Sequence, residues 1–171
     1  MTTPALRLDH LAFPSFDVGA TQRFYGETLG LPLVAAYSGA SPEWGGRDYV
    51  MMTYALAGGR HLVFFGLEGL ASPAADGLPR DIRHVALTVT SARDFARWKT
   101  RLGRRGVPYW EEDHGDQASI YFSDPNGHTF EITFPASRAA SRPSPAARRL
   151  VAEWVRTHPA RRARRRTRPR D

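Results

Sequence analysis

The sequence predicts an α+β fold of two tandem βαβββ modules, whose strands form a curled mixed sheet around a cavity. Two observations support this prediction. An internal repeat relates residues 8–13 (LDHLAF) to residues 82–87 (IRHVAL) at a constant offset of 74 residues. Apolar and small or polar residues also alternate along these segments, which is the pattern of strands with two different faces.

Each repeat continues in the same order. The first strand is followed by an amphipathic helix that ends at a Leu-Gly pair, and a proline then opens three further strands. The helical stripe is clearest in the second module, at Phe95, Trp98 and Leu102. The expected helices are 18–29 and 92–104, and the expected strands are 6–13, 32–38, 48–56, 60–67, 82–90, 107–112, 117–123 and 128–134.

These elements divide the chain into four parts. The first module is expected at 1–67, a Gly-, Ala- and Pro-rich linker at 68–80, the second module at 81–137, and a C-terminal helix with a basic tail at 138–171. In the last part, Ser144 and Pro145 are typical of a helix start, and an apolar stripe follows. We expect a helix at 145–157 that docks on the body or on a partner subunit, and a disordered Arg-rich tail at 161–170.

The net charge of +7 comes from this C-terminal part. Residues 138–171 have a net charge of +10, whereas residues 1–137 have a net charge of −3, so the charge does not indicate a nucleic-acid partner. The absence of cysteine excludes disulfides and thiolate metal ligands. No membrane-length apolar run and no secretory signal is visible, so we expect a cytoplasmic protein without a membrane partner.

Strand alternation places the candidate functional residues on the small or polar faces. In the first strand His10 lies opposite to the face of Leu11 and Phe13, and His84 and Glu131 occupy similar faces in the second module. We expect the bulky faces to pack on the helices and the other faces to line the cavity. His10, His84 and Glu131 then predict a divalent-metal site for Fe(II), Mn, Zn, Ni or Co.

These motifs resemble the vicinal oxygen chelate superfamily, which includes glyoxalase I, methylmalonyl-CoA epimerase, fosfomycin thiol transferases, bleomycin-resistance proteins and extradiol dioxygenases. The resemblance covers residues 6–134. It rests on DHLA at 9–12, FY at 24–25, LGL at 29–31, IRHVAL at 82–87 and FSDPNGHTFE at 122–131. It implies a triad of ligands that leaves coordination positions open for substrate or O2.

The resemblance also favours one reaction. Val63 aligns with Glu131 in the repeat, whereas glyoxalase I and the epimerase carry a fourth ligand near that position. The spacing of His114, Tyr121 and Glu131 resembles the signature of extradiol dioxygenases, with Glu112 as a departure from it. It implies an Fe(II) enzyme acting on a catechol-like, aromatic small molecule. His114 and Tyr121 would flank the substrate, and His61 would act as acid–base. Many extradiol enzymes have four such modules, whereas this chain has two.

Two other classes remain open. One is a metal-dependent lyase or isomerase, or a thiol transferase, resembling glyoxalase or a resistance enzyme. The other is a metal-free resistance protein that sequesters a planar aromatic drug. The aromatic residues available for it are Trp44, Tyr49, Tyr54, Phe65, Tyr109 and Trp110. Relatives with two modules are often homodimers, so we expect a homodimer whose site lies within one chain or between two.

Overall fold

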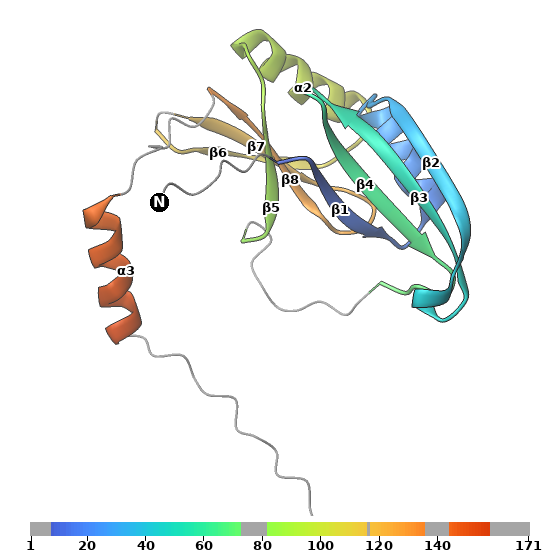
Figure 1. The fold of residues 1–171 in the computed structure, drawn as a ribbon. Helices are drawn as coiled ribbons and strands as arrows, with labels where there is room; N and C mark the ends of the chain where they lie inside the picture. Colours follow the sequence, from blue (N-terminus) through green and yellow to red (C-terminus); the bar gives the residue numbers. More distant parts are fainter. Residues whose placement is uncertain (1–7, 73–81, 116, 136–143, 158–171) are drawn as a thin grey trace, which may run out of the picture. The chain divides into compact units, whose positions relative to one another are not determined.

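The computed structural model describes residues 8–72, 82–115, 117–135 and 144–157 of the chain. The first module begins with strand β1 and a helix that starts as α1 and continues as a π-helical turn over Arg23–Thr28. Three strands follow, with a short 3-10 turn at Pro42–Trp44 between the first two (Figure 1). The bounds are β1 His10–Ser15, α1 Val18–Gln22, β2 Leu33–Ser41, β3 Arg47–Leu56 and β4 Arg60–Leu67.

The second module repeats this order of strand, helix and three strands. Its bounds are β5 His84–Thr88, α2 Ala92–Arg104, β6 Tyr109–Asp113, β7 Ala118–Ser123 and β8 Thr129–Phe134. Each module forms its own four-stranded mixed sheet, ordered β1-β4-β3-β2 in the first and β5-β8-β7-β6 in the second. In both sheets the first strand of the module runs parallel to the last, and the remaining pairs are antiparallel. The predicted fold of tandem βαβββ modules is confirmed.

The helices begin where capping residues stand in the sequence. The Asp17 side chain accepts a hydrogen bond from the backbone nitrogen of Ala20 at 2.8 Å, and Ser91 Oγ accepts one from that of Asp94 at 3.1 Å. The first helix ends before Gly30, whose positive φ of 72° suits glycine. Both predicted helices therefore form within one residue of their expected ends.

The two sheets share one hydrophobic core. Phe13 of β1 lies 6.3 Å from Phe130 of β8, measured between ring centroids. Tyr25 lies 5.9 Å from the same ring, and Phe24 lies 6.2 Å from Phe122. These side chains stand on the bulky strand faces and on the first helix. Because successive side chains point to opposite faces of a strand, the polar faces of both sheets point away from this core.

A buried polar network also joins the modules. Tyr25 Oη donates to Asp124 Oδ2 at 2.9 Å across 99 residues of sequence. Asn126 Nδ2 donates to Thr21 Oγ1 at 2.9 Å, and Asn126 Oδ1 accepts from the backbone nitrogen of Phe16 at 2.9 Å. The turn between β7 and β8 is thus bonded to the first helix and to the residue after β1.

The chain separates into two compact units, residues 1–137 and residues 138–171. In the second unit, helix α3 spans Pro145–Thr157, as the sequence predicts. Its start is capped by Ser144 Oγ, which accepts from the backbone nitrogen of Ala147 at 3.1 Å. The predicted disordered tail lies outside the described residues. Among the described helices, none has the length and apolar character needed to cross a membrane.

Candidate functional site

The second module brings His84 and Glu131 together. β5 and β8 pair in parallel, with Ala86 opposite Glu131. His84 Nε2 lies 2.9 Å from Glu131 Oε2, and the Glu131 side chain is 8% exposed. Ser119 on β7 donates from Oγ to the other carboxylate oxygen, Oε1, at 2.5 Å. A nitrogen and an oxygen that both suit a divalent metal therefore stand side by side, in an orientation fixed by a buried hydroxyl.

Tyr121 lies directly across the strand pair from Glu131. Its Oη is 3.2 Å from His114 Nε2, so the two sequence-predicted catalytic residues are hydrogen-bonded to each other. The His84 ring meets the Tyr121 ring edge-on at a centroid distance of 5.6 Å. Trp110 covers the tyrosine by stacking at 5.2 Å with an interplanar angle of 16°. The described side chains thus place Tyr121 beside the His84–Glu131 pair, with His114 bonded to the tyrosine.

The surroundings keep the Tyr121 hydroxyl protonated. Burial raises the pKa of Tyr121, and the negative charges of Glu131 and Glu112 raise it further. Glu112 also accepts a hydrogen bond from Trp110 Nε1 at 2.9 Å and lies 3.8 Å from His114 Nε2. At neutral pH Tyr121 is therefore a hydrogen-bond donor, and a carboxylate stands close to its histidine partner.

His10 and His61 lie side by side on neighbouring strands of the first module. They are register partners in the parallel β1–β4 pair. His10 Nδ1 lies 2.6 Å from Asp9 Oδ1, and this contact with His10 is the main reason that the pKa of Asp9 is lowered. A carboxylate bonded to one ring nitrogen is the arrangement that orients a metal-ligating histidine through its other nitrogen. The His10 side chain is 52% exposed.

The pairing register also locates Val63. Ala12 lies opposite Val63 in the first sheet, just as Ala86 lies opposite Glu131 in the second. The two sheets therefore align Val63 with Glu131, as the internal repeat in the sequence does. A buried valine stands where the second module carries its carboxylate, and valine has no atom that binds a metal.

The structure does not bring His10 to the His84–Glu131 pair. Within residues 8–72, 82–115, 117–135 and 144–157, no group of three or more His, Asp or Glu side chains is arranged to hold a metal ion. The shared core explains this separation, because the polar faces of the two sheets point away from it in one chain. The predicted triad is thus present as a pair and a separate histidine.

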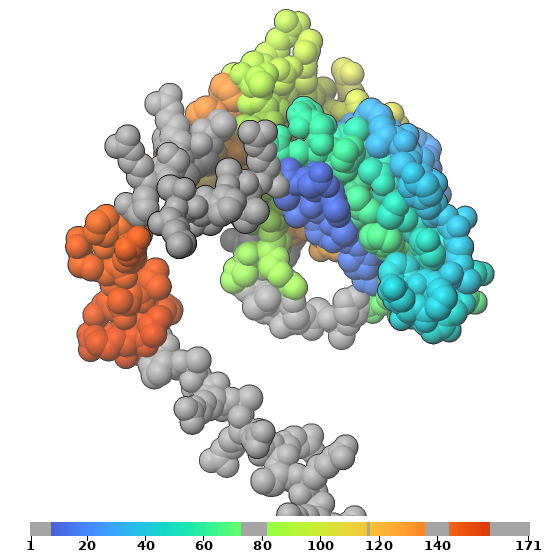
Figure 2. Space-filling view, in the orientation of Figure 1, coloured from blue at the N-terminus to red at the C-terminus, as the bar shows by residue number. Residues whose placement is uncertain are grey.

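A wide cleft reaches both modules. It has a volume of about 1210 Å³ and is lined by His61 and His84 together with mostly apolar side chains, among them Leu31, Leu56 and Trp98. Parts of the two edge strands that border it, β1 in dark blue and β5 in light green, are at the surface of this unit (Figure 2). The cleft can hold an apolar or aromatic molecule, or apolar side chains of another chain.

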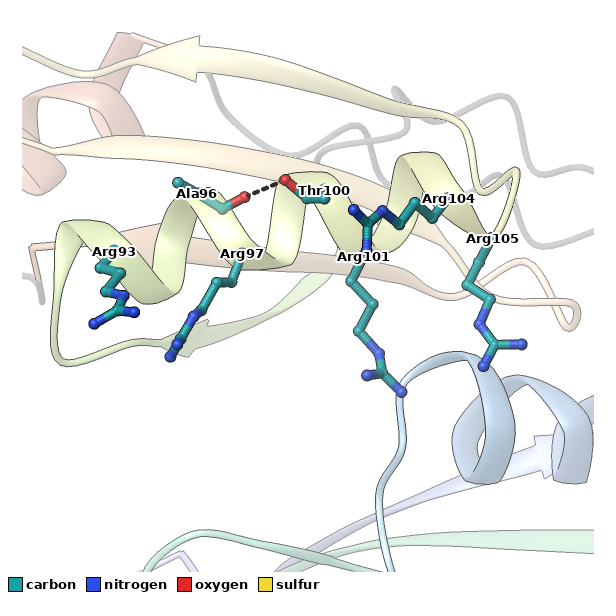
Figure 3. A pocket seen from close by; sticks show the side chains of 7 residues that line it. All are labelled: Arg93, Ala96, Arg97, Thr100, Arg101, Arg104 and Arg105. Atoms are coloured by element: carbon teal, nitrogen blue, oxygen red, sulfur yellow. Dashed lines mark hydrogen bonds between the residues drawn. The ribbon is translucent and has the colours of Figure 1, made fainter.

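A second hollow, of about 580 Å³, lies along α2 and carries five arginines. Figure 3 shows Arg93, Arg97 and Arg101 projecting to the same side of the helix. Arg101 donates from Nε to the carbonyl oxygen of Thr28 at 2.6 Å and lies over the Trp98 ring. None of the predicted site residues lines this hollow. We assign it a structural role at Arg101, which bonds α2 to the end of the first helix.

The sequence did not predict that two residues, Ser119 and Trp110, support the site. Ser119 and Trp110 hold Glu131 and Tyr121 in place. Ser119 could have been predicted from the sequence, because strand alternation puts it on the same face as Tyr121. The stacking of Trp110 on Tyr121 could not have been predicted from its aromatic character alone, because it depends on the β6–β7 pairing that sets the two residues opposite each other.

Comparison with known proteins places these features in a family. Residues 7–132 match the family model of the Glyoxalase/Bleomycin resistance protein/Dioxygenase superfamily. The chain is 32% identical over 141 residues to the glutathione transferase FosA of Serratia marcescens, covering 81% of this chain and 89% of that protein.

Two solved structures share the fold. Oxidase ChaP-H2 has a TM-score of 0.54 and 26% identity, with 76% of this chain and 94% of the other covered. Lactoylglutathione lyase from Agrobacterium tumefaciens has a TM-score of 0.55 and 22% identity, with 76% and 94% covered. The second likeness bears on the fold alone.

Proposed function

Because the chain belongs to the glyoxalase/bleomycin resistance protein/dioxygenase superfamily, we propose that it is a divalent-metal enzyme that cleaves a catechol-like ring with O2. His84 and Glu131 would hold the metal together with His10. The fit rests on the donor set: two imidazoles and a carboxylate suit Fe(II), Mn, Zn, Ni or Co. The hydrogen bonds from Ser119 to Glu131 and between His10 and Asp9 orient the donors as metal ligands require.

The proposed site is completed by a second copy of the chain. His84 and Glu131 lie in one module, and the shared core keeps His10 away from them in the same chain. In a homodimer with two-fold symmetry, His10 of each chain can reach the His84–Glu131 pair of the other, which makes two equivalent sites. His61 is the register partner of His10, so it would enter the same site with it.

The hydrogen-bonded pair of His114 and Tyr121 is the observation that carries the ring-cleavage proposal. Tyr121 is protonated and can donate to a substrate oxygen beside His84 and Glu131. His114 Nε2 is hydrogen-bonded to Tyr121 Oη. When Nε2 carries the proton, His114 donates to Tyr121 and leaves the tyrosine proton for the substrate. His114 and His61 can each take or return a proton. When bound, the metal supplies Lewis acidity, a template for two adjacent oxygens and, as Fe(II), O2 chemistry.

The presence of Val63 supports a metal site with coordination positions open to substrate and O2. A carboxylate at this position would add a fourth protein ligand, whereas valine leaves room for two substrate oxygens and O2. The same residue disfavours an isomerase that uses such a carboxylate as its base.

The proposed ring cleavage needs no external reductant. Both oxygen atoms of O2 enter the product when the carbon–carbon bond next to the diol is cleaved.

Thiol transfer is the second candidate, and the 32% identity to a glutathione transferase favours it. The same three ligands would serve an enzyme that polarises a substrate oxygen while the glutathione sulfur bonds to the adjacent carbon, the carbon–oxygen bond breaks and the oxygen takes the thiol proton. In that case Tyr121 and His114 would position the substrate, and O2 would play no part.

The deciding experiment is anaerobic reconstitution with Fe(II), followed by oxygen-electrode measurements over a panel of catechols. We expect oxygen uptake that depends on both the catechol and the iron. A parallel series with Mn(II), glutathione and electrophilic substrates tests the second candidate. Thiol consumption in this series, with no oxygen uptake in the first, would replace ring cleavage with group transfer.

A further inference from the structure

Helix α3 presents a continuous apolar face to its surroundings. Leu150, Val151, Trp154 and Val155 recur at the spacing of one helix face. Their exposed fractions are 72%, 62%, 63% and 62%. Four large apolar side chains on one face are costly to leave in water, so this face is suited to contact an apolar phase.

The opposite face of α3 is basic. Arg149 and Arg156 lie on it, and Arg148 lies at its border beside Val155. The single acidic residue of the helix, Glu153, is paired with Arg156. The sequence that follows, residues 158–171, contains seven arginines and no large apolar residue. Residues 138–171 have a net charge of +10. A ligand of this segment must therefore offer negative charge as well as an apolar layer.

These requirements discriminate between possible occupants. A second copy of α3 would cover the apolar face, but it would bring two segments of net charge +10 together. A nucleic acid would neutralise the arginines, but its charged backbone would leave Leu150, Val151 and Val155 without an apolar contact. An anionic bilayer surface accepts both, because Trp and aliphatic side chains enter the boundary between headgroups and acyl chains while arginines stay at the phosphates.

We propose that α3 and the arginine-rich segment after it bind the chain to an anionic lipid surface. The helix lies in the plane of the surface, with Leu150, Val151, Trp154 and Val155 directed into it. The apolar face supplies insertion and the arginines supply attraction, and two such contributions are what stable, reversible surface binding requires. The proposal is independent of the reaction catalysed by the first unit.

The test is co-sedimentation of the full chain with vesicles of phosphatidylcholine alone and vesicles that also contain phosphatidylglycerol. We expect binding to the anionic vesicles only, and a fall in the bound fraction as salt is raised. Leu150→Asp with Trp154→Asp should weaken binding about tenfold or more, because each aspartate removes insertion and adds repulsion. Deleting residues 158–171 should also weaken it, because seven arginines are lost.

The arginine row of α2 provides a matched control. Arg93→Glu with Arg104→Glu changes more charge than the aspartate pair but leaves α3 intact, so vesicle binding should be nearly unchanged. Circular dichroism and gel filtration show whether each variant is folded. Equal binding to neutral vesicles, or loss of binding in the α2 variant only, overturns the proposal. Binding to a DNA duplex that survives Leu150→Asp and Trp154→Asp, without vesicle binding, assigns the segment to nucleic acid instead.

Discussion

Tyr121 contacts His84, His114 and Trp110 around the predicted metal site. It is 4% exposed, bonded to His114, stacked on Trp110 and opposite Glu131 in the sheet. Its raised pKa keeps the proton that it would donate to substrate. Tyr121 is not among the proposed metal ligands. A substitution at Tyr121 should therefore change turnover without changing metal binding.

Replacing Tyr121 with Phe should lower kcat of the iron-reconstituted enzyme about tenfold, the rate equivalent of one lost hydrogen bond of roughly 1.4 kcal/mol. Bound iron should remain at the wild-type level. Oxygen uptake and metal analysis by mass spectrometry provide the two measurements. Tyr37→Phe is the control, because Tyr37 is 61% exposed on β2. If iron is lost together with activity, Tyr121 supports the ligands rather than the substrate.

Alanine at His10, His84 or Glu131 should each abolish stoichiometric metal binding. The reason is the donor count, since two protein ligands hold a divalent metal far more weakly than three. Far-UV circular dichroism should stay close to that of the wild type. His61→Ala is the matched control, because His61 pairs with His10 in the sheet but would handle protons instead of metal. Full metal retention in all three ligand variants would rule out the triad.

At the scale of elements, the turn between β7 and β8 holds the modules together. Asp124 is buried and accepts hydrogen bonds from Tyr25 Oη and from the backbone nitrogens of Asn126 and His128, at 2.9, 2.9 and 2.8 Å. From the sequence, Asp124–Gly127 served as a marker of family resemblance. The partners of this turn in the first module, Tyr25 and Thr21, lie about 100 residues earlier in the chain, and no local pattern predicts such contacts.

Asp124→Ala should lower the free energy of unfolding by about 2 to 4 kcal/mol, because it leaves several buried donors unpaired. Denaturant titration measures the loss, and Asp48→Ala on the exposed part of β3 is the control, expected to lie within about 0.5 kcal/mol of the wild type. An equal effect of the two substitutions would show that the network adds nothing to stability.

The same carboxylate predicts a pH dependence. Burial alone raises the pKa of Asp124, but the hydrogen bonds and charge of His128 and the amide of Asn126 outweigh it, so the pKa is lowered. A lowered folded-state pKa contributes stability that is present above the unfolded value of about 3.9 and is lost as pH falls through the folded value. The difference in stability between the wild type and Asp124→Ala should therefore shrink below about pH 4.

Strand alternation and the repeat predict much of the whole molecule. They place the helices, the strands and the polar face that carries Glu131, because all of these depend on local periodicity. They do not predict how the two modules pack. That packing depends on aromatic contacts such as Phe13 with Phe130, which join residues more than a hundred positions apart. Whether His10 reaches Glu131 within one chain is decided by this packing, so the sequence left the question open.

A mixing experiment decides whether the metal site is shared between two chains. His10→Ala lacks one ligand but retains His84 and Glu131, whereas Glu131→Ala lacks the carboxylate but retains His10. In a heterodimer of the two, one site combines an intact pair with an intact His10, and the other site carries both defects.

If chains share their sites, unfolding and refolding equal amounts of the two variants together should restore roughly a quarter of the wild-type metal content. About half of the dimers formed at random are heterodimers, and each has one intact site of two. Mixing His84→Ala with Glu131→Ala is the control, because both substitutions damage the same half of the site and no combination repairs it. Metal that returns in the first mixture and not in the second requires ligands from two chains; no return in either, with dimers present by gel filtration, would place all the ligands within one chain.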